Sequence, residues 1–288
     1  MQRWNGWGDE NIYLELPTRA LRMMHDLIGK GQGRPDYPRE KFIKRMPESR
    51  LNSHPLISLD PKLRLDHAHG QSFPDWIGLR GGKLRRFPDG VALPTTAAEI
   101  QELLKFAIDN NAVVIPFGGG TSVVGHLEVP ETRRPVLSLS LERFNRLTDL
   151  DSNSRLATFE SGIRGPQLEY QLNSRGFILG HYPQSFEYSS LGGWVVTRSS
   201  GQQSRHYGRI EQLFAGGEVL TPRGALKLPP FPASAAGPDL RQILLGSEGK
   251  MGVLTNVVVK IVALPEKDDV YGVFFPSWER AFHAVQSI

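Results

Sequence analysis

The chain has 288 residues, of which 39% are hydrophobic and 22% charged, as is typical of a soluble globular protein of about two domains. It contains no cysteine, which excludes disulfides, thiolate metal sites, a catalytic thiol and a cofactor tethered through cysteine. No stretch resembles a transmembrane span or a signal peptide, so we expect a cytoplasmic protein.

The net charge of +4 makes the chain mildly basic. Basic side chains gather within residues 34–50 and at Arg80, Lys83, Arg85 and Arg86. They are expected either to form a solvated face or to attract an anionic lipid surface or a phosphorylated substrate. No aromatic side chains interleave with them as a nucleic-acid platform requires, so a nucleic-acid partner is not expected.

Residues 1–87 are expected to form an N-terminal extension with much loop and one helix over 16–28. A short strand is expected over 91–94. Thr96 and Glu99 then have the spacing of a capping box, which marks the start of a helix.

Apolar residues of this helix follow the i, i+3, i+4, i+7, i+8 spacing and predict one buried face, made of Ile100, Leu103, Leu104, Ala107 and Ile108. The apolar run 113–117 predicts the next strand. Strand, helix and strand in so few residues indicate a βαβ unit, so the sheet is at least partly parallel.

A second set of elements follows from about residue 143 to 266. Strands are expected over 156–159, 177–179, 213–221 and 253–262, and helices over 167–175 and 239–245.

The C-terminal residues predict the start of a further domain. A strand is expected over 270–275, followed by Ser277 as N-cap and a helix over 278–288 with Phe282 and Val285 on one side. Because the sequence stops inside this helix, we expect the chain to be a fragment in which 267–288 begin a truncated cap or substrate domain.

The most informative segment is Val114-Ile-Pro-Phe-Gly-Gly-Gly-Thr-Ser-Val-Val-Gly125. Its glycines let successive backbone N–H groups turn toward a ligand and form an anion nest, which favours a phosphorylated cofactor. A P-loop is excluded because no lysine follows the glycines, and a Rossmann turn because Val123 occupies the last glycine position. A plain glycine-rich turn is the alternative.

Three later segments have the same combination of glycines, hydroxyls and turn residues, namely 183–189, 192–199 and 246–252. One such loop is common. Four in this order are hard to explain by packing alone and favour one extended cofactor site.

With these four segments, residues 88–265 resemble the FAD-binding (PCMH-type) domain of the vanillyl-alcohol-oxidase-like superfamily. The chain is most similar to the alkylglycerone-phosphate synthase family through Arg3-Trp-Asn-Gly-Trp-Gly8, Gly192-Gly-Trp-Val-Val-Thr-Arg-Ser-Ser-Gly201, and His206-Tyr-Gly-Arg-Ile-Glu211 with Thr221-Pro-Arg-Gly224. This resemblance implies an α+β fold with mixed sheets flanked by helices, in two subdomains over about 88–142 and 143–266.

The resemblance also implies which residues contact FAD. The first segment would surround the diphosphate, the second and third the flavin and ribityl side, and the fourth the adenosine portion. The implied contact residues are Pro116, Phe117, Gly118, Gly119, Gly120, Thr121, Ser122, Pro183, Gln184, Ser185, Phe186, Glu187, Tyr188, Ser189, Val196, Thr197, Arg198, Ser199, Ser247, Glu248, Gly249, Lys250, Met251, Gly252 and Val253.

Some members of the superfamily tether the flavin through a histidine where this chain has Thr121, so FAD is expected to be bound non-covalently. His181 and Tyr182 are expected near the flavin edge. Arg198 is expected either to face the diphosphate or to form a structural ion pair. Phe117, His126 and Lys250 are unusual for the family, and Lys250 is expected to pair with a phosphate or to point to solvent.

The implied reaction exchanges the acyl chain of acyl-dihydroxyacetone phosphate for a fatty alcohol, in ether lipid synthesis. Catalytic residues are expected beyond Ile288, and no metal site is expected. An FAD-dependent D-2-hydroxyacid dehydrogenase or oxidase and an inactive flavin-binding module are the alternatives. Expected partners are the lipid substrates or a 2-hydroxy acid, with peripheral membrane contact and a homodimer as further expectations.

Overall fold

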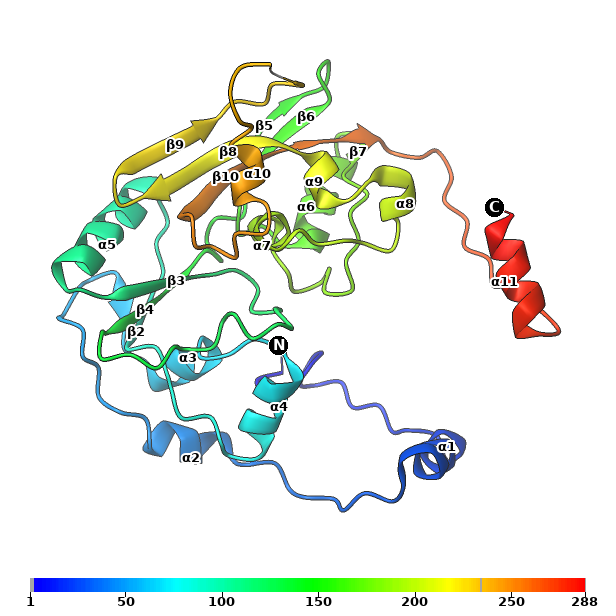
Figure 1. Cartoon of the computed structure of the whole chain (residues 1–288), viewed down its shortest axis with the longest axis horizontal. Coiled ribbons are helices and arrows are strands. Elements are labelled where there is room, and N and C mark those ends of the chain that lie inside the picture. The colour runs from blue at the N-terminus through cyan, green and yellow to red at the C-terminus, as the bar shows by residue number, and fades with distance from the viewer. Residues whose placement is uncertain (1–2, 234, 288) are drawn as a thin grey trace.

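A computed structural model describes residues 3–233 and 235–287 of the chain. Figure 1 shows two lobes stacked on one another, each built around its own sheet. We call the lobe of the four-stranded sheet the first lobe and that of the five-stranded sheet the second lobe. This mixed α and β architecture agrees with the expected fold class.

The first lobe contains the predicted βαβ unit. Its strands are β1 (Ile57–Ser58), β2 (Gly90–Ala92), β3 (Val113–Phe117) and β4 (Val136–Ser140), in the order β1-β2-β4-β3. Both β2 and β3 run parallel to β4, which the sequence analysis missed and which lies between them. The parallel arrangement that the spacing predicted is therefore present.

Helix α5 (Ala97–Asp109) connects β2 to β3 and starts with the predicted capping box of Thr96 and Glu99. Its first four predicted core residues are buried, but Ile108 is 57% exposed, so that part of the prediction is wrong. At about 100° per residue, Ile108 lies about 80° around the helix from Ile100. It therefore falls at the edge of the buried stripe.

The second lobe has an antiparallel sheet. Its strands are β5 (Leu147–Asp151), β6 (Leu156–Glu160), β8 (Phe214–Thr221), β9 (Gly224–Leu228) and β10 (Val253–Lys260), in the order β5-β6-β10-β8-β9. The long β-branched run in β10 pairs with both β6 and β8 at the centre of the sheet, and five of its eight residues are buried. Strands β7 (Phe177–Ile178) and β11 (Val262–Ala263) form a separate two-stranded antiparallel sheet.

Short helices pack against this sheet and complete the second core. They are α6 (Gly165–Asn173), α7 (Leu191–Thr197), α9 (Ile210–Leu213) and α10 (Arg241–Leu244), whereas α8 (Ser204–Tyr207) has no buried residue. Phe159, Trp194 and Val257 belong to one buried cluster. A second cluster joins the lobes, because Leu220 and Val253 of the second lobe pack with the buried face of α5.

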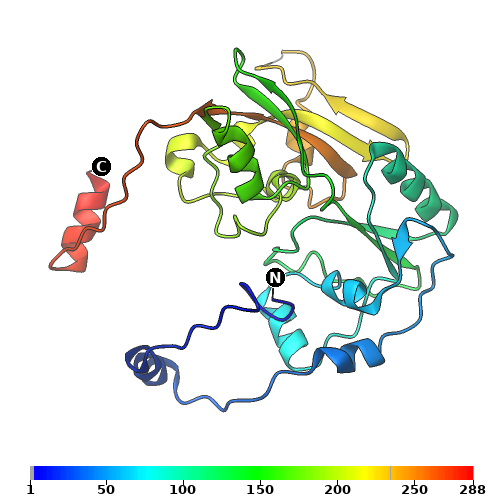
Figure 2. The ribbon, with the colours of Figure 1, turned by 180° about the vertical axis from the view of Figure 1, so that it is seen from behind.

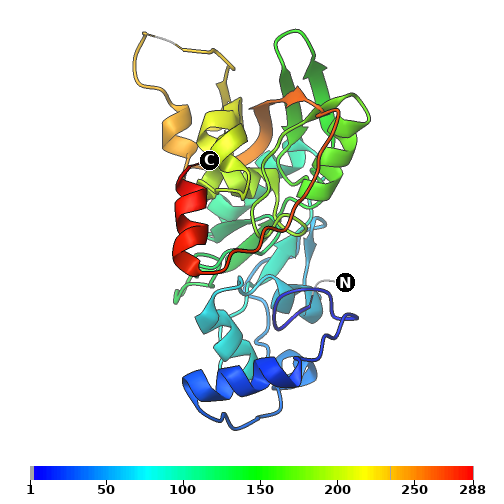
Figure 3. The same ribbon diagram turned by 90° about the vertical axis from the view of Figure 1, so that its right-hand side faces the viewer.

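The N-terminal extension is more ordered than expected. It forms α1 (Thr18–Ile28), α2 (Arg39–Lys44), α3 (Pro61–Asp66) and α4 (Phe73–Arg80). Phe42, Leu65 and Leu79 of the last three helices make a core of their own with Phe87. Figure 3 shows these helices below the two sheets.

Two arginines of the basic residues within 34–50 are fixed by ion pairs. Arg39 contacts Asp66 at 2.6 Å, and Arg50 contacts Asp89 at 2.7 Å. Asp89 is buried and also accepts from the Val136 N–H at 2.7 Å, so Arg50 holds a carboxylate that joins the extension to β4. These two arginines therefore have structural roles.

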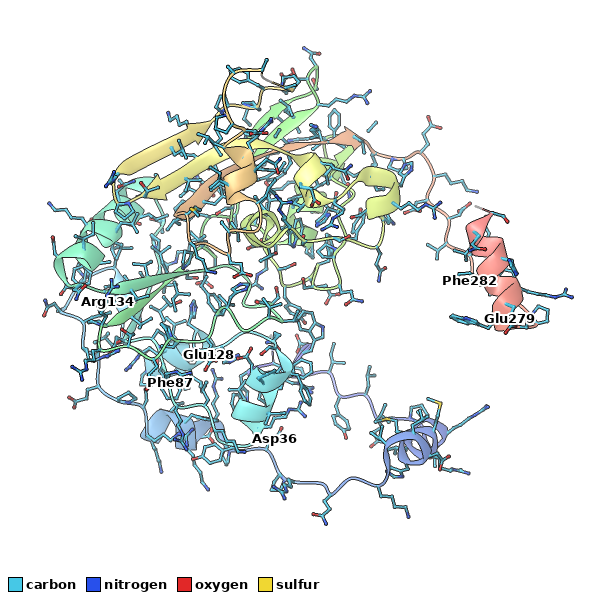
Figure 4. All side chains as sticks on the ribbon, in the orientation of Figure 1. Asp36, Phe87, Glu128, Arg134, Glu279 and Phe282 are labelled. Carbon is cyan, nitrogen blue, oxygen red and sulfur yellow. The ribbon has the colours of Figure 1, made fainter. Side chains whose placement is uncertain are left out.

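The C-terminal segment leaves the body of the molecule and ends in α11 (Trp278–Gln286), with α1 similarly displaced at the other end (Figures 1 and 2). Ser277 caps α11 as predicted, accepting from the Arg280 N–H at 3.4 Å. Ile288, the expected last residue of this helix, lies outside the described residues. Phe282 is 56% exposed and stands clear of both lobes (Figure 4).

The strand expected over 270–275 is wrong. These residues form no strand, and Val270 and Phe274 are more than 90% exposed. A strand needs a neighbouring strand to satisfy its backbone groups, and this segment runs away from both sheets. Within residues 3–233 and 235–287, no helix combines the length and the apolar character needed to cross a membrane.

Candidate cofactor cavity

A cavity of about 730 Å³ lies at the junction of the two lobes. All four glycine- and hydroxyl-rich segments contribute to its wall. The predicted residues that line it are Pro116, Gly118, Gly119, Gly120, Thr121, Ser122, Gln184, Ser185, Ser189, Val196, Thr197, Ser199, Glu248, Gly249 and Gly252. Four segments spread over more than 130 residues of sequence thus meet around one space.

The other predicted residues lie in the same segments but outside this lining. They are Phe117, Pro183, Phe186, Glu187, Tyr188, Arg198, Ser247, Lys250, Met251 and Val253. Phe117 is buried beneath the loop, with its ring centroid 4.0 Å from that of His67. Met251, Lys250 and Val253 line a second, smaller cavity of about 490 Å³ behind the fourth segment.

The glycines of the first segment are required by close packing. A Cβ at Gly119 would overlap the backbone carbonyl of Tyr188, and one at Gly118 would overlap the Ser190 hydroxyl. Gly120 has φ +67°, a conformation that favours glycine. The first and second segments can therefore touch, and their backbones both reach the cavity surface.

The third segment is a helix and not the loop that its glycines suggested. Ser190 is the N-cap of helix α7, and its hydroxyl accepts from the Gly193 N–H at 3.3 Å. Arg198 is the C-cap and lies in the left-handed region with φ +52°. The indole N–H of Trp194 donates to the Ser189 hydroxyl at 2.6 Å. Burial of Trp194 and the serine cap outweigh the low helix propensity of glycine here.

Arg198 does not face the cavity. Its Nε donates to the Leu245 carbonyl at 3.1 Å and its Nη2 to Gln242 Oε1 at 3.2 Å. The alternative in which it faces a diphosphate is therefore wrong, and its observed partners are a carbonyl and an amide. Lys250 is exposed, with its Nζ 3.4 Å from Glu248 Oε2.

One charged cluster does border the cavity. His126 Nδ1 lies 3.1 Å from Ser122 Oγ and 3.8 Å from Glu248 Oε1, which joins the first segment to the fourth. Burial lowers the pKa of His126, and the Glu248 carboxylate partly opposes this shift. Glu248 has φ +54° and its N–H donates to the Val196 carbonyl at 2.8 Å.

His181 and Tyr182 were expected near the flavin edge, but neither of them lines the cavity. His181 is fully buried, its Nε2 lies 2.7 Å from Ser199 Oγ, and burial lowers its pKa to about 4. Burial also raises the pKa of Tyr182 to about 12, and neither residue contributes to the cavity wall. Their side chains belong to the second lobe behind the lining.

The sequence analysis missed three lining residues in the N-terminal extension: Trp7, Gln71 and Trp76. The Gln71 N–H donates to the Ser122 carbonyl at 2.6 Å, and Gln71 Oε1 accepts from the Trp76 indole at 2.7 Å. Trp7 lies in the Arg3–Gly8 motif, which was noted only as a family signature. The extension therefore forms one wall of the cavity.

The chemistry of the wall fits an extended dinucleotide. Backbone and hydroxyl groups of Gly118–Ser122 occupy one part of it, where a diphosphate can accept N–H donors. Apolar and aromatic side chains, among them Trp7, Trp76 and Val124, occupy other parts and suit flat rings. A Cβ on Gly118 or Gly119 would disrupt this cradle.

Comparison with known proteins decides the class of cofactor. Residues 88–227 match the family described as FAD binding domain. FAD is therefore the cofactor of this fold. The first three segments of the cavity lie inside the matched region, and the fourth, 246–252, lies beyond its end.

The FAD-binding domain and its flanking residues resemble one group of flavoproteins over almost the whole chain. Alkyldihydroxyacetonephosphate synthase of Trypanosoma brucei brucei is 37% identical over 315 residues, covering 98% of this chain and 51% of that protein. A solved structure of an alkyldihydroxyacetonephosphate synthase superposes with a TM-score of 0.86 at 32% identity, covering 99% of this chain and 58% of that one. The resemblance found in the motifs is confirmed.

D-lactate dehydrogenase [cytochrome] 1 of Saccharomyces cerevisiae is more distant, at 29% identity over 65% of this chain and 32% of that protein. The chain spans about half the length of the synthase that it matches. Among the residues that the structure describes, no group of three or more histidine, aspartate or glutamate side chains is placed to hold a metal ion.

Proposed function

We propose that this chain is the FAD-binding portion of an alkylglycerone-phosphate synthase, which exchanges the acyl group of acyl-dihydroxyacetone phosphate for a fatty alcohol. The observation that carries the proposal is the meeting of all four predicted segments around one cavity, in a chain similar to these synthases along almost its whole length. When bound, FAD supplies the chemistry of the exchange.

In this proposal the chain's own residues bind and orient the cofactor. The amides of Gly118–Gly120 hold the diphosphate, and the hydroxyls of Thr121 and Ser122 add hydrogen bonds. The second and third segments lie along the flavin and ribityl side, and the fourth borders the adenosine portion. The side chains of the N-terminal extension exclude water from one side of the site.

We also propose that FAD is held without a covalent bond, because the chain has no cysteine and Thr121 stands at the tethering position. Acid precipitation of the purified yellow protein tests this. All of the flavin is expected in the supernatant, and flavin that stays with the pellet would show a covalent link.

The exchange itself is tested by incubating the FAD-loaded chain with acyl-dihydroxyacetone phosphate and a labelled fatty alcohol. Label recovered in an alkyl ether product, together with release of free fatty acid, supports the proposal. The D-2-hydroxyacid dehydrogenase is the second candidate, favoured by the more distant similarity to D-lactate dehydrogenase. Anaerobic bleaching of the flavin by D-lactate would support that candidate instead.

A yellow chain that is inert in both assays would support the third alternative, a flavin-binding module. The same chain should then be assayed with the remaining half of a related synthase added as a separate polypeptide. Activity restored by this addition would assign the chain to the exchange reaction, whereas continued inactivity would leave it with cofactor binding alone.

A further inference from the structure

The first described residues form a compact turn against helix α4. The Arg3 N–H donates to the Gly8 carbonyl at 2.8 Å, and Gly8 has φ +95°. Arg80, the last residue of α4, donates from Nε to the Asn5 carbonyl at 3.1 Å. Figures 1 and 2 both show this N-terminal segment beside α4.

A second bond fixes the other side of this turn. Asn5 Nδ2 donates to Asp36 Oδ2 at 2.9 Å, and Asn5 is only 8% exposed. Figure 4 labels Asp36 at the lower end of α4. The turn is thus tied to the body at Asn5, two residues before Trp7.

Trp7 projects from this turn to the cavity. Its side chain lines the cavity wall, is 38% exposed, and meets the Tyr188 ring edge to face at a centroid distance of 5.5 Å. Tyr188 belongs to the second segment, whose backbone touches Gly119. Trp7 therefore reaches across from the N-terminal extension to the side proposed for the flavin.

A half-exposed tryptophan that borders a cavity offers a face to a flat ring. Aromatic stacking stabilises a bound ring beyond the burial of area, because the rings attract through their polarisable faces. The isoalloxazine is the larger of the two flat rings of FAD. No other part of the turn of residues 3–8 reaches the lining.

We propose that residues 3–8 are a strap that closes one side of the FAD site, with Trp7 stacked on the isoalloxazine. Through this strap the N-terminal extension contributes a direct contact to the cofactor. This inference rests on the proposed placement of the flavin beside the second segment. It assigns to Trp7 a positioning role for FAD and no part in bond making.

The test compares Trp7→Ala and Trp7→Phe with the wild-type chain, all loaded with FAD. Trp278→Ala is the matched control, since Trp278 is 82% exposed on α11, away from both lobes. Two quantities are measured: the rate at which FAD leaves the protein on dilution, and the fluorescence yield of the bound flavin. Tryptophan in contact with a flavin quenches that fluorescence by donating an electron to the excited ring.

Trp7→Ala is expected to release FAD about tenfold faster, the effect of losing one stacking contact of about 1.4 kcal/mol. Trp7→Phe is expected to keep most of the retention but to fluoresce more brightly, because phenylalanine packs without donating an electron. Trp278→Ala should match the wild type in both quantities. If Trp7→Ala fails to fold, the fluorescence of Trp7→Phe still decides the question.

Unchanged retention and unchanged flavin fluorescence in the Trp7 variants would overturn the strap while leaving FAD binding intact. Faster release of FAD with unchanged flavin fluorescence in both variants would also overturn it, since Trp7 would then act only on the fold. A wild-type chain that binds no FAD would instead contradict the proposed function, so the two failures are distinguishable.

Discussion

His126 and Glu248 approach each other to 3.8 Å at the edge of the cavity; His126 directly follows the first segment, and Glu248 belongs to the fourth. Lys250 approaches the other carboxylate oxygen of Glu248 at 3.4 Å. His126 and Lys250, both expected from the resemblance to be unusual residues at their positions, therefore meet on one carboxylate. The contact links segments that are more than 120 residues apart in sequence.

This contact predicts a pH dependence of FAD binding. Burial lowers the pKa of His126, so the imidazole is neutral at pH 8 and gains a proton as the pH falls below its ordinary range. A protonated His126 adds positive charge beside Ser122, where the diphosphate is proposed to bind. Because the pKa of His126 is lowered, this proton is taken up below the ordinary range of histidine, and we expect FAD to bind more tightly at pH 5 than at pH 8, as measured by fluorescence titration.

The control for this prediction is His126→Asn, which keeps a hydrogen-bonding side chain but cannot titrate. Its FAD affinity should vary little between pH 5 and pH 8. Equal pH dependence in the variant and the wild type would show that another group is responsible.

The packing of the first segment against the second predicts the effect of Gly119→Ala. The new methyl group would overlap the Tyr188 carbonyl, so the two segments must move apart. We expect the free energy of unfolding to fall by about 1–3 kcal/mol, as for other overpacked sites, and FAD retention to fall with it. Thermal unfolding with and without FAD measures both effects.

Gly272→Ala provides the comparison, because a Cβ there meets no atom within 4 Å. It should change neither stability nor retention. A stable Gly119→Ala variant that holds FAD normally would contradict the close contact.

The bond between Trp194 and Ser189 predicts the cost of Ser189→Ala. Trp194 is 2% exposed, and its buried indole N–H would lose its hydrogen-bond partner. Leaving a buried donor unpaired costs about 1–3 kcal/mol of unfolding free energy, which denaturant titration can measure. Ser53→Ala, at an exposed position, should be neutral, and an equal loss in both variants would contradict this role of Ser189.

Two buried histidines predict sensitivity of the fold to acid. Burial lowers the pKa of both His67 and His181 to about 4, whereas unfolded histidine titrates near pH 6.5. Below pH 6.5 these two histidines bind protons in the unfolded chain but stay neutral in the folded chain. The free energy of unfolding therefore falls as the pH drops from about 6.5 to 4. Each histidine accounts for about 3 kcal/mol over this range.

His67→Gln removes one of these groups and retains a polar side chain beside Ser138, which lies 2.9 Å from His67 Nδ1. The loss of stability between pH 6.5 and 4 should be smaller in this variant than in the wild type, whatever its stability at pH 8. An identical decline in the two proteins would show that His67 is already protonated in the folded state.

Local patterns predicted much of the fold. The capping box at Thr96, the strand over 113–117 and the long strand that became β10 could be read directly, because each has a strong periodic or β-branched signal. β4 was missed because Val136–Ser140 alternates leucine with serine in a fully buried strand. The expected strand over 270–275 failed because strand pairing depends on a distant partner, which composition does not reveal.

In the cavity, too, local sequence patterns predicted some of the residues and tertiary packing determined the others. Glycines and hydroxyls marked the four segments, since each has a local backbone requirement. The direction of Arg198 and the burial of His181 depend on tertiary packing and could not be predicted. Trp7 and Gln71 were missed as lining residues because they lie in the N-terminal extension, far in sequence from the glycine segment that they approach.

The most direct test of the account is a crystal structure of the chain with FAD bound. The account predicts that the diphosphate oxygens lie within hydrogen-bond distance of the Gly118–Gly120 amides, and that the same dinucleotide also contacts the other three segments. A diphosphate bound elsewhere, or an FAD that leaves the cavity between the lobes empty, would contradict it.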